Sequence, residues 1–194
     1  MAAERLFFAL WPPASVVSAL VAERQRWPGQ AGRPTHPEDL HATVVFLGAV
    51  ETDQRACAEE VAGRLSAPPF SLTLDRVGYW PGPRIRWAGQ ECVPDALLAL
   101  VHQLNAALTG CGHRPERRPY RLHITLARKA APLSAATLPR PIHWSVTELV
   151  LAASRAGQRP AYRVLRRWPL TAPPAISQDG RSPIGTDGAD RGPV

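Results

Sequence analysis

A five-residue pattern, Leu-His-x-Thr followed by an apolar residue, occurs twice in this chain of 194 residues. Its copies are Leu40-His41-Ala42-Thr43-Val44 and Leu122-His123-Ile124-Thr125-Leu126, with the histidines 82 positions apart (123 − 41). β-Branched and apolar residues dominate both segments, so each is expected to be a strand. A repeat at about half the folded length predicts two pseudo-equivalent lobes, each contributing one His-x-Thr strand.

The period of a strand decides what such a repeat can do. Residues i and i+2 point to the same face, so His41 projects with Thr43, and His123 projects with Thr125. The intervening apolar residues face the other way, into a buried layer. If the two lobes face each other, two imidazoles and two hydroxyls converge on one cleft.

The remaining sequence indicates an α+β fold, because strands and helices alternate without a regular βαβ period. We expect one domain over residues 1–172 and a disordered tail over 173–194, where Pro, Gly, Ser, Asp and Arg prevail. Apolar periodicity places strands at 6–11, 40–47, 70–75, 85–87, 121–128, 146–152 and 162–170, and helices at 14–27, 52–65 and 94–109. Gly110 is expected to close the last helix.

The charge of the chain favours a polyanionic ligand without proving one. The formal net charge is +7 and the pI is about 10.3, and Lys129 is the only lysine. Arginine contacts phosphates through paired N–H groups and stacks on bases. A compositional bias of the source toward arginine explains the same numbers equally well.

Cysteine spacing and hydropathy indicate a soluble cytoplasmic protein. Cys57, Cys92 and Cys111 are widely spaced and form no Cys-x-x-Cys pair, so neither a disulfide framework nor a zinc site is expected. The apolar run 6–11 is too short for a signal peptide, and no segment approaches the length of a membrane span.

Two histidines and two threonines in one cleft suit phosphodiester cleavage. A neutral imidazole can take a proton from water while a protonated one gives a proton to the leaving oxygen, because both roles need a pKa near neutrality. The Thr43 and Thr125 hydroxyls can donate to the non-bridging phosphate oxygens. Arg128, five residues past His123, can reach the phosphate. No metal or cofactor is needed.

The alternative is that the histidines are structural, as a lone histidine on a strand usually is. The repeated pattern argues against it, and the other histidines, which lack a Thr two residues on, are expected to be structural or on the surface. These are His36, His102, His113 and His143. Zinc-ligand spacing, a Gly-rich phosphate loop and a Gly-x-Ser-x-Gly elbow are all missing from the sequence.

At these residues the sequence resembles the 2H phosphoesterase superfamily, specifically the RNA 2′,3′-cyclic phosphodiesterases, also called 2′-5′ RNA ligase-like proteins. The resemblance extends from about residue 5 to 170 and is carried by the segments 5–10, 37–48, 78–87 and 118–128. Ala42 stands where the family usually has a bulkier residue, and Leu122 where it often has Pro.

The resemblance implies a bilobal fold in which two antiparallel sheets line a V-shaped cleft and the helices lie outside. It also implies hydrolysis of a terminal RNA 2′,3′-cyclic phosphate to a 2′-phosphate without ATP or metal. His41 is then the general acid for O3′ and His123 the general base for water, while Thr43, Thr125 and Arg128 hold the phosphate. Run in reverse, this chemistry joins RNA ends.

The expected partner is RNA with cyclic-phosphate ends, bound by a monomer. Candidate RNA contacts are Phe46, Tyr79, Trp80, Arg84, Trp87 and Tyr120. Arg86, Arg117, Arg118 and Arg121 could follow the RNA backbone. The aromatic residues could equally belong to the core, and the arginines to a solvated basic face.

Two other functions remain open from the sequence. One is a non-catalytic module that binds RNA ends, although a pure binder has no need for two titrating groups. The other is a 2H phosphodiesterase that acts on a small cyclic nucleotide.

Overall fold

The computed structural model describes residues 4–26, 32–155 and 157–172. The strands are β1 (Glu4–Leu10), β2 (Arg33–Pro34), β3 (Ala42–Val50), β4 (Phe70–Trp80), β5 (Ile85–Gly89), β6 (Ile124–Arg128), β7 (Ala136–Val146), β8 (Glu148–Ser154) and β9 (Tyr162–Pro169). The helices are α1 (Ala14–Gln25), α2 (Thr52–Gly63) and α3 (Asp95–Leu108), with short 3-10 turns η1 (Pro37–Asp39) and η2 (Thr109–Cys111). The expected α+β class is confirmed.

The strands run in the order β7-β4-β5-β6-β3-β1-β8-β9, with β2 added to β6, and every pairing in the described residues is antiparallel. The two His-x-Thr strands, β3 and β6, are central neighbours, but they pair only at Ala42 and Ile124. The sheet therefore consists of two halves joined at one residue pair, β7-β4-β5-β6 with β2 on one side and β3-β1-β8-β9 on the other. This agrees with two lobes that meet along the motif strands.

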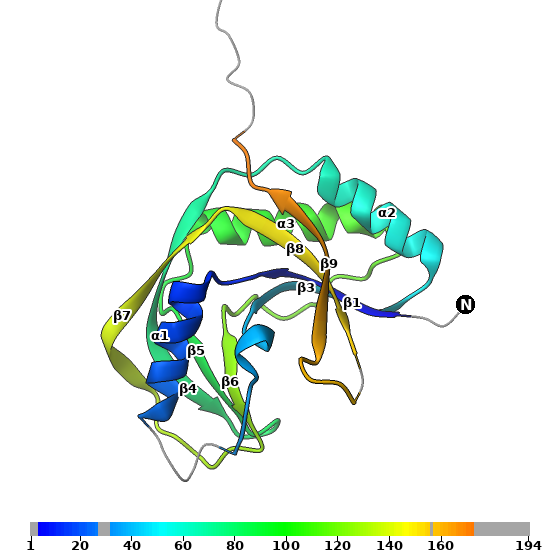
Figure 1. Ribbon diagram of the computed structural model, residues 1–194. Helices are drawn as coiled ribbons and strands as arrows, with labels where there is room; N and C mark the ends of the chain where they lie inside the picture. The colour runs from blue at the N-terminus through cyan, green and yellow to red at the C-terminus, as the bar shows by residue number, and fades with distance from the viewer. Residues whose placement is uncertain (1–3, 27–31, 156, 173–194) are drawn as a thin grey trace, which may run out of the picture.

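The helices are divided between the two halves (Figure 1). Helix α1 contacts β6 and β7, while α3 contacts β3 and packs beside α2 over the other half. The chain thus crosses between the lobes repeatedly, for example after β1, between β2 and β3, and after α3. As a result, each lobe is built from segments far apart in the sequence.

Strand β1 shows why its sequence reads as a continuous apolar run. Leu6, Phe8 and Leu10 are buried in the main core beneath the helices. The alternate residues Phe7 and Ala9 are buried on the opposite face, where they pack with Val150, Ala152, Trp11 and Tyr162. A strand buried on both faces has no polar side to alternate with.

One strand, β7, was not predicted from the sequence. Strand β7 contains Pro139 and Pro141, which argue against a strand, and no strand was expected there. The structure places β7 at the edge of the sheet, beside β4 alone. Proline is tolerated at an edge because the missing N–H faces no partner strand.

The expected end of the third helix was also wrong in detail. Helix α3 stops at Leu108 and continues as the 3-10 turn η2. The left-handed residue that ends this turn is Gly112, with φ 81°, and not Gly110. The stretch after Gly112 then runs to β6 without regular structure.

The expectation of no disulfide is wrong. Cys57 on α2 and Cys111 on η2 form a disulfide with a Cα–Cα distance of 5.7 Å, while Cys92 is free and exposed. The two cysteines are 54 positions apart, and they meet because α2 and α3 pack side by side. Sequence spacing does not contain that information. The cytoplasmic location stays a prediction, and the cysteines no longer support it.

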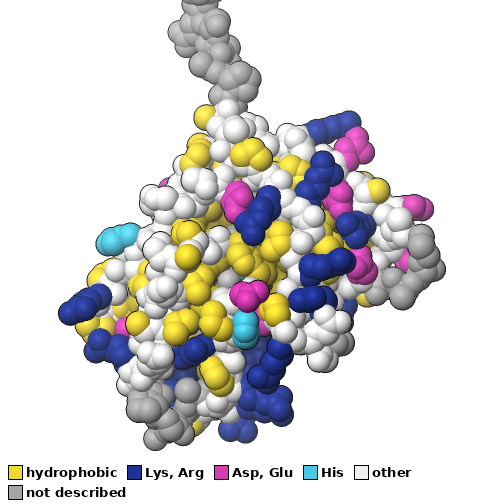
Figure 2. All heavy atoms as spheres, in the orientation of Figure 1, with side chains coloured by type: hydrophobic (Ala, Val, Ile, Leu, Met, Phe, Trp, Pro, Cys, Tyr) yellow, Lys and Arg dark blue, Asp and Glu magenta, His cyan; other side chains and the backbone are white. Residues whose placement is uncertain are grey.

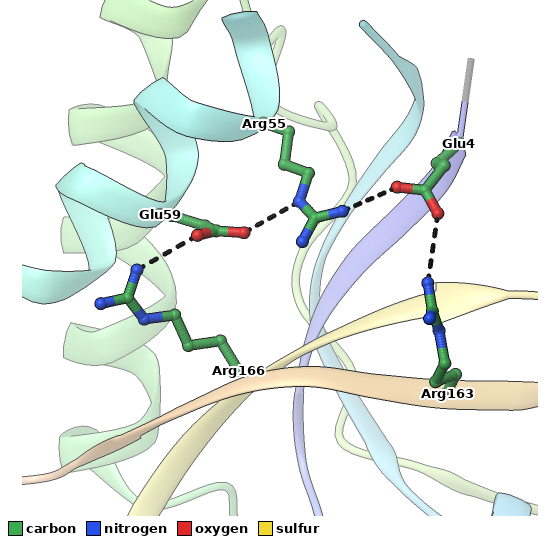
Figure 3. A network of polar contacts seen from close by, with 5 residues as sticks. All are labelled: Glu4, Arg55, Glu59, Arg163 and Arg166. Atoms are coloured by element: carbon green, nitrogen blue, oxygen red, sulfur yellow. Dashed lines mark hydrogen bonds and ion pairs between the residues drawn. The ribbon is translucent and has the colours of Figure 1, made fainter. Parts of the chain in front are cut away.

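A network of ion pairs joins α2 to two strands (Figure 3). The Arg55 guanidinium lies 2.9 Å from carboxylate oxygens of both Glu4 and Glu59, and Glu59 also accepts from Arg166 at 3.1 Å. Arg163 reaches Glu4 at 3.6 Å. These contacts raise the pKa of Arg55, with Glu59 as the main cause, so its charge is fixed. The network ties α2 to β1 and β9.

No helix among the described residues is long and apolar enough to cross a membrane. The tail predicted to be disordered, 173–194, lies outside the described residues, as does Trp27 at the expected end of the first helix.

Candidate active site

The two motif histidines are held in the same way. His41 Nδ1 lies 2.6 Å from the carbonyl oxygen of Asp39, and His123 Nδ1 lies 2.9 Å from that of Arg121. A carbonyl can only accept, so each Nδ1 carries the proton and donates it. In the neutral form, each Nε2 is then free to take a proton. The local fold repeats because each histidine immediately precedes its strand and bonds back to residue i−2.

Aromatic side chains surround His41. Trp11 stacks on it at 5.3 Å between ring centroids, and Phe7 lies at 4.9 Å. Tyr162 meets it edge-on, also at 4.9 Å. The buried Asp39 carboxylate accepts from the backbone N–H groups of Ala161 and Tyr162, at 3.0 and 3.1 Å. Asp39 therefore fixes both the imidazole, through its carbonyl, and the strand that encloses it.

His123 is less enclosed than His41. Its ring meets the Trp80 ring in an edge arrangement, with 4.6 Å between the ring centroids. Burial lowers the pKa of both histidines, to about 4 for His41. The charge of Arg128 lowers both pKa values further, and His123 lowers that of His41. His123 and Arg128 are therefore near enough to act electrostatically on His41, and Arg128 is near enough to act on His123. The structure thus brings the three predicted groups to one place.

The predicted alternation of the motif strands is confirmed. Ala42 and Val44 of β3 are buried, as are Ile124 and Leu126 of β6. Thr43 and Thr125 remain half-buried. The two threonines therefore share the less buried side of their strands with the histidines that precede them.

Backbone contacts from β2 fix the end of β6 at Arg128. Arg33 pairs with Arg128, and the Thr35 N–H donates to the Leu126 carbonyl at 3.0 Å. Gly32 packs so tightly here that a Cβ would come within 2.4 Å of the Arg128 carbonyl oxygen, and its φ is +69°. Only glycine meets both conditions.

Side chains from β4 and β5 hold the residues that follow Arg128. Arg86 Nε donates to the Ala131 carbonyl at 3.2 Å, and Tyr79 donates to the Ala130 carbonyl at 3.4 Å. The Ala130 N–H donates in turn to the Arg84 carbonyl at 3.0 Å. Arg86 is 3% exposed, so the expectation that it follows an RNA backbone is wrong. These contacts position the backbone that carries the Arg128 guanidinium.

The candidate RNA contacts separate into two groups. Trp80 and the exposed Phe46 border the pocket beside His123, where an RNA could reach them. Trp87 lies beneath Trp80 and over Gly78, where a Cβ would come within 2.3 Å of the indole. The Tyr120 hydroxyl donates to the Thr43 carbonyl at 3.0 Å, and burial raises its pKa. Trp87, Tyr120 and Tyr79 therefore have structural contacts, and Tyr120 lines the pocket as well. Arg84 is exposed in the turn between β4 and β5.

A pocket of about 660 Å³ opens beside His123 and Thr43. Arg118 and Arg121 lie along it, with apolar residues of β3 and α3. Figure 2 shows Lys and Arg side chains spread over one face of the molecule, with apolar side chains between them. A volume of this size suits a ligand as large as a nucleoside.

The histidines outside the motifs have local roles or lie at the surface. His36 Nδ1 accepts from the Glu38 N–H at 3.3 Å, and His143 contacts Thr73 at 3.3 Å. His113 bonds to Asn105, and His102 is exposed on α3. In the part of the chain that the structure describes, no three His, Cys, Asp or Glu residues cluster as metal ligands would.

Sequence reasoning missed three residues of the site and gave a fourth another role. Trp11 and Tyr162 enclose His41, and Asp39 bonds to both His41 and Tyr162. Arg86, expected along an RNA backbone, instead supports the segment after Arg128. Only Asp39 had a local signal, because it lies two residues before the motif histidine. The others lie far from the motif histidines in the sequence.

Comparison with known proteins agrees with this geometry. The sequence model of the 2′-5′ RNA ligase superfamily matches residues 12–158. An RNA 2′,3′-cyclic phosphodiesterase of Escherichia coli K12 is 39% identical over 173 residues, which cover 87% of this chain and 97% of that protein. One from Thermus thermophilus is 31% identical and covers 86% of this chain and 90% of that protein.

Solved structures of similar proteins share this fold. The crystal structure of E. coli LigT complexed with 3′-AMP superposes with a TM-score of 0.80 at 34% identity, covering 87% of this chain and 99% of that one. The Thermus thermophilus protein TT0787 gives a TM-score of 0.74 at 28% identity, covering 87% of this chain and 98% of that one.

Proposed function

This chain belongs to the 2′-5′ RNA ligase superfamily, and on that premise we propose that it is an RNA 2′,3′-cyclic phosphodiesterase. Its reaction opens a terminal cyclic phosphate to a 2′-phosphate by histidine acid–base catalysis. The observation that carries the proposal is the matched pair of imidazoles, each with Nδ1 on the carbonyl two residues back, in electrostatic contact with each other and with Arg128.

The reaction needs two proton transfers on opposite sides of the phosphorus. His123 Nε2 takes a proton from water as the water oxygen bonds to phosphorus, and His41 Nε2 gives a proton to O3′ as the P–O3′ bond breaks. The phosphate stays attached through O2′. Thr43, Thr125 and Arg128 would donate to the non-bridging oxygens, where negative charge accumulates.

For His41 to act as the general acid, its imidazole must be protonated when the substrate is bound. With a pKa of about 4, His41 is neutral at pH 7 in the free protein, whereas a general acid must be protonated. A bound phosphate anion raises the pKa of a neighbouring imidazole. We therefore expect substrate binding to charge His41, and a histidine titration followed by NMR with and without inorganic phosphate would detect that rise.

The joining of RNA ends is also part of the proposal. If an RNA 5′-hydroxyl takes the place of water, the same transfers form a P–O5′ bond, break P–O3′ and leave a 2′-5′ linkage. Hydrolysis is expected to dominate, because water is always present at high concentration.

The decisive experiment follows hydrolysis of an oligonucleotide ending in a 2′,3′-cyclic phosphate, in the presence of EDTA. The wild type should form the 2′-phosphate, while His41→Ala and His123→Ala should each lose at least about a hundredfold in kcat. His102→Ala, at an exposed position on α3, is the matched control. Full activity in both motif variants would disprove the assignment.

Two substrates and one binding assay separate the alternatives. An enzyme for small cyclic nucleotides would turn over a cyclic mononucleotide faster than the oligonucleotide. A non-catalytic module would bind the oligonucleotide in a salt-dependent way without turnover.

A further inference from the structure

Trp11 lies across from His41 because of the register between β1 and β3. The last pair in that register is Leu10 with Ala42, and one further antiparallel step sets Trp11 opposite His41. Side chains that are directly opposite on neighbouring strands are in contact. The indole accordingly stacks on the imidazole, with the two rings 10° from parallel and 5.3 Å between their centroids.

The backbone around Trp11 holds the indole in this position. Pro12 follows directly, and the ring of a proline keeps the residue before it in an extended conformation. Pro13 is then the N-cap of α1. The half-buried indole also packs against the apolar cluster that contains Phe7 and Val150. Trp11 therefore presents a fixed face to the imidazole.

The three aromatic neighbours of His41 meet it in different ways. Tyr162 makes an edge contact, with 83° between the ring planes, and Phe7 is tilted by 33°. Trp11 is the one of the three that lies face to face with the imidazole. The face of an aromatic ring is negative and its edge positive, and the indole face holds a cation best. Trp11 thus has both the geometry and the ring type that attract a positive charge.

The charged groups around His41 oppose one another. Burial is the largest effect and lowers the pKa of His41, and the positive charges of His123 and Arg128 lower it further. The Asp39 carboxylate and the hydrogen bond to the Asp39 carbonyl raise it. Tyr162 is the other titratable residue in contact, through its ring. Because water is excluded, an imidazolium here depends on such neighbours for its stabilisation.

Under the proposed function, on which this inference rests, His41 must be protonated when the substrate is bound. A bound phosphate supplies negative charge at Nε2, but the imidazolium still forms among three aromatic rings. A cation over an indole face is stabilised most where water is excluded. We propose that the face of Trp11 stabilises the imidazolium of His41, which makes Trp11 a positioning residue for the general acid.

The indole makes and breaks no bond in this scheme. Nε2 of the His41 imidazolium gives its proton to O3′ as the P–O3′ bond breaks, and Nδ1 keeps its proton on the Asp39 carbonyl. Trp11 changes the fraction of His41 that is charged when the substrate is bound. Its effect should therefore appear in the pH dependence of kcat, with little change in KM.

Fluorinated tryptophans at position 11 test the proposal with almost no change in side-chain shape. Each fluorine withdraws electron density from the indole face, so a cation held there loses stabilisation stepwise from monofluorotryptophan to tetrafluorotryptophan. Truncation to leucine would not isolate this effect, because it also admits water, which favours the charged imidazole. An NMR titration of His41 in the presence of inorganic phosphate measures its proton affinity along the series.

We expect the proton affinity of His41 in the phosphate complex to fall stepwise, by about threefold to tenfold over the whole series. On the alkaline side of the pH profile, kcat for a 2′,3′-cyclic mononucleotide should fall by a similar factor. Lowering the pH should restore it, because more His41 is then protonated. Tetrafluorotryptophan at Trp144, which is buried in the core, is the matched control and should change neither quantity.

The outcomes separate this role from the proposed function. A constant proton affinity along the series, with hydrolysis intact, would overturn the role of Trp11 alone. An equal loss of kcat at every pH would also overturn it, because altered packing has that effect. Absence of hydrolysis in the wild type would overturn both proposals. The monofluorinated and difluorinated proteins give the same trend should the tetrafluorinated protein fail to fold.

Discussion

At the scale of single residues, the two motif histidines differ in how far they are removed from water. Phe7, Trp11 and Tyr162 enclose His41, while His123 has one aromatic neighbour, Trp80, and borders an open pocket. Burial is accordingly the main cause that lowers the pKa of His41 to about 4. The difference in burial between His41 and His123 affects the stability of the protein as well as its chemistry.

His41 should make the protein less stable in mild acid. Its pKa is 6.5 when unfolded and about 4 when folded, so the unfolded chain binds the proton first as pH falls. The loss begins near pH 6.5, grows toward pH 4 and amounts to roughly 3 kcal/mol. Urea unfolding of the wild type and His41→Asn at pH 7, 5.5 and 4.5 measures it.

In that experiment the wild type should lose more free energy of unfolding between pH 7 and 4.5 than His41→Asn does. His102→Asn, at an exposed position, should behave as the wild type. Equal pH dependence in the wild type and His41→Asn would show that His41 is not buried in its neutral form.

The two threonine hydroxyls allow a separate prediction at this scale. Thr43→Val and Thr125→Val keep a β-branched side chain on each strand but remove a donor to the phosphate. Each should lower kcat by about a hundredfold with little effect on the melting temperature. Serine at either position should restore most of the activity, and a valine variant with wild-type kcat would exclude that hydroxyl from the site.

At the scale of elements, several contacts hold the end of β6 and the segment that follows it. Strand β2 pairs with the last two residues of β6. The Arg86 and Tyr79 side chains donate to the carbonyls of Ala131 and Ala130 in the segment after β6. Arg128 itself is exposed, so these contacts, more than its own packing, determine where its guanidinium lies. We therefore expect Arg86 to position Arg128.

Arg86→Met should therefore weaken substrate binding. It keeps the buried length but removes the N–H that bonds to Ala131, and we expect KM for a cyclic mononucleotide to rise by about fivefold to tenfold, with a smaller change in kcat. The matched control is Arg64→Met, because the Arg64 side chain is exposed at the end of α2, where it pairs with Glu60. An unchanged KM in a folded Arg86→Met protein would contradict the positioning role.

At the scale of the whole molecule, covalent and ionic links secure the lobe that carries His41. The Cys57–Cys111 disulfide joins α2 to the end of the α3 segment, and the Glu4–Arg55–Glu59–Arg166 contacts join α2 to β1 and β9. Residue 113, two positions after Cys111, already lines the pocket beside His123. The disulfide thus anchors one end of the pocket wall.

Removing the disulfide should destabilise the protein by roughly 2 to 4 kcal/mol, since it closes a loop over 54 positions. Cys57→Ser with Cys111→Ser should lower the unfolding midpoint, and dithiothreitol should do the same to the wild type. Cys92→Ser, at the free exposed cysteine, is the control. A midpoint insensitive to reductant would show that the pairing contributes nothing to stability.

The repeated motif allowed both motif strands and the orientation of their side chains to be predicted, because the period of a strand is a local property. Buried Ala42 and Ile124, with half-buried Thr43 and Thr125, follow from that period alone. Strand β7 was not predicted, because whether prolines fit a strand depends on its being at an edge. The contacts of Trp87 with Gly78 and of Tyr120 with the Thr43 carbonyl could not be predicted from residue type, and their role as RNA contacts stays a prediction.

The sequence by itself determined the two histidines, their threonines, Arg128 and the two-lobed arrangement, because spacing along a strand fixes which side chains project together. Only the tertiary structure decided that β3 and β6 meet at one residue pair and then separate, which opens the pocket beside His123. It also decided the burial of His41, the support of Arg128 by Arg86 and the Cys57–Cys111 bond. Each of these depends on contacts between residues far apart in the chain, which local periodicity does not encode.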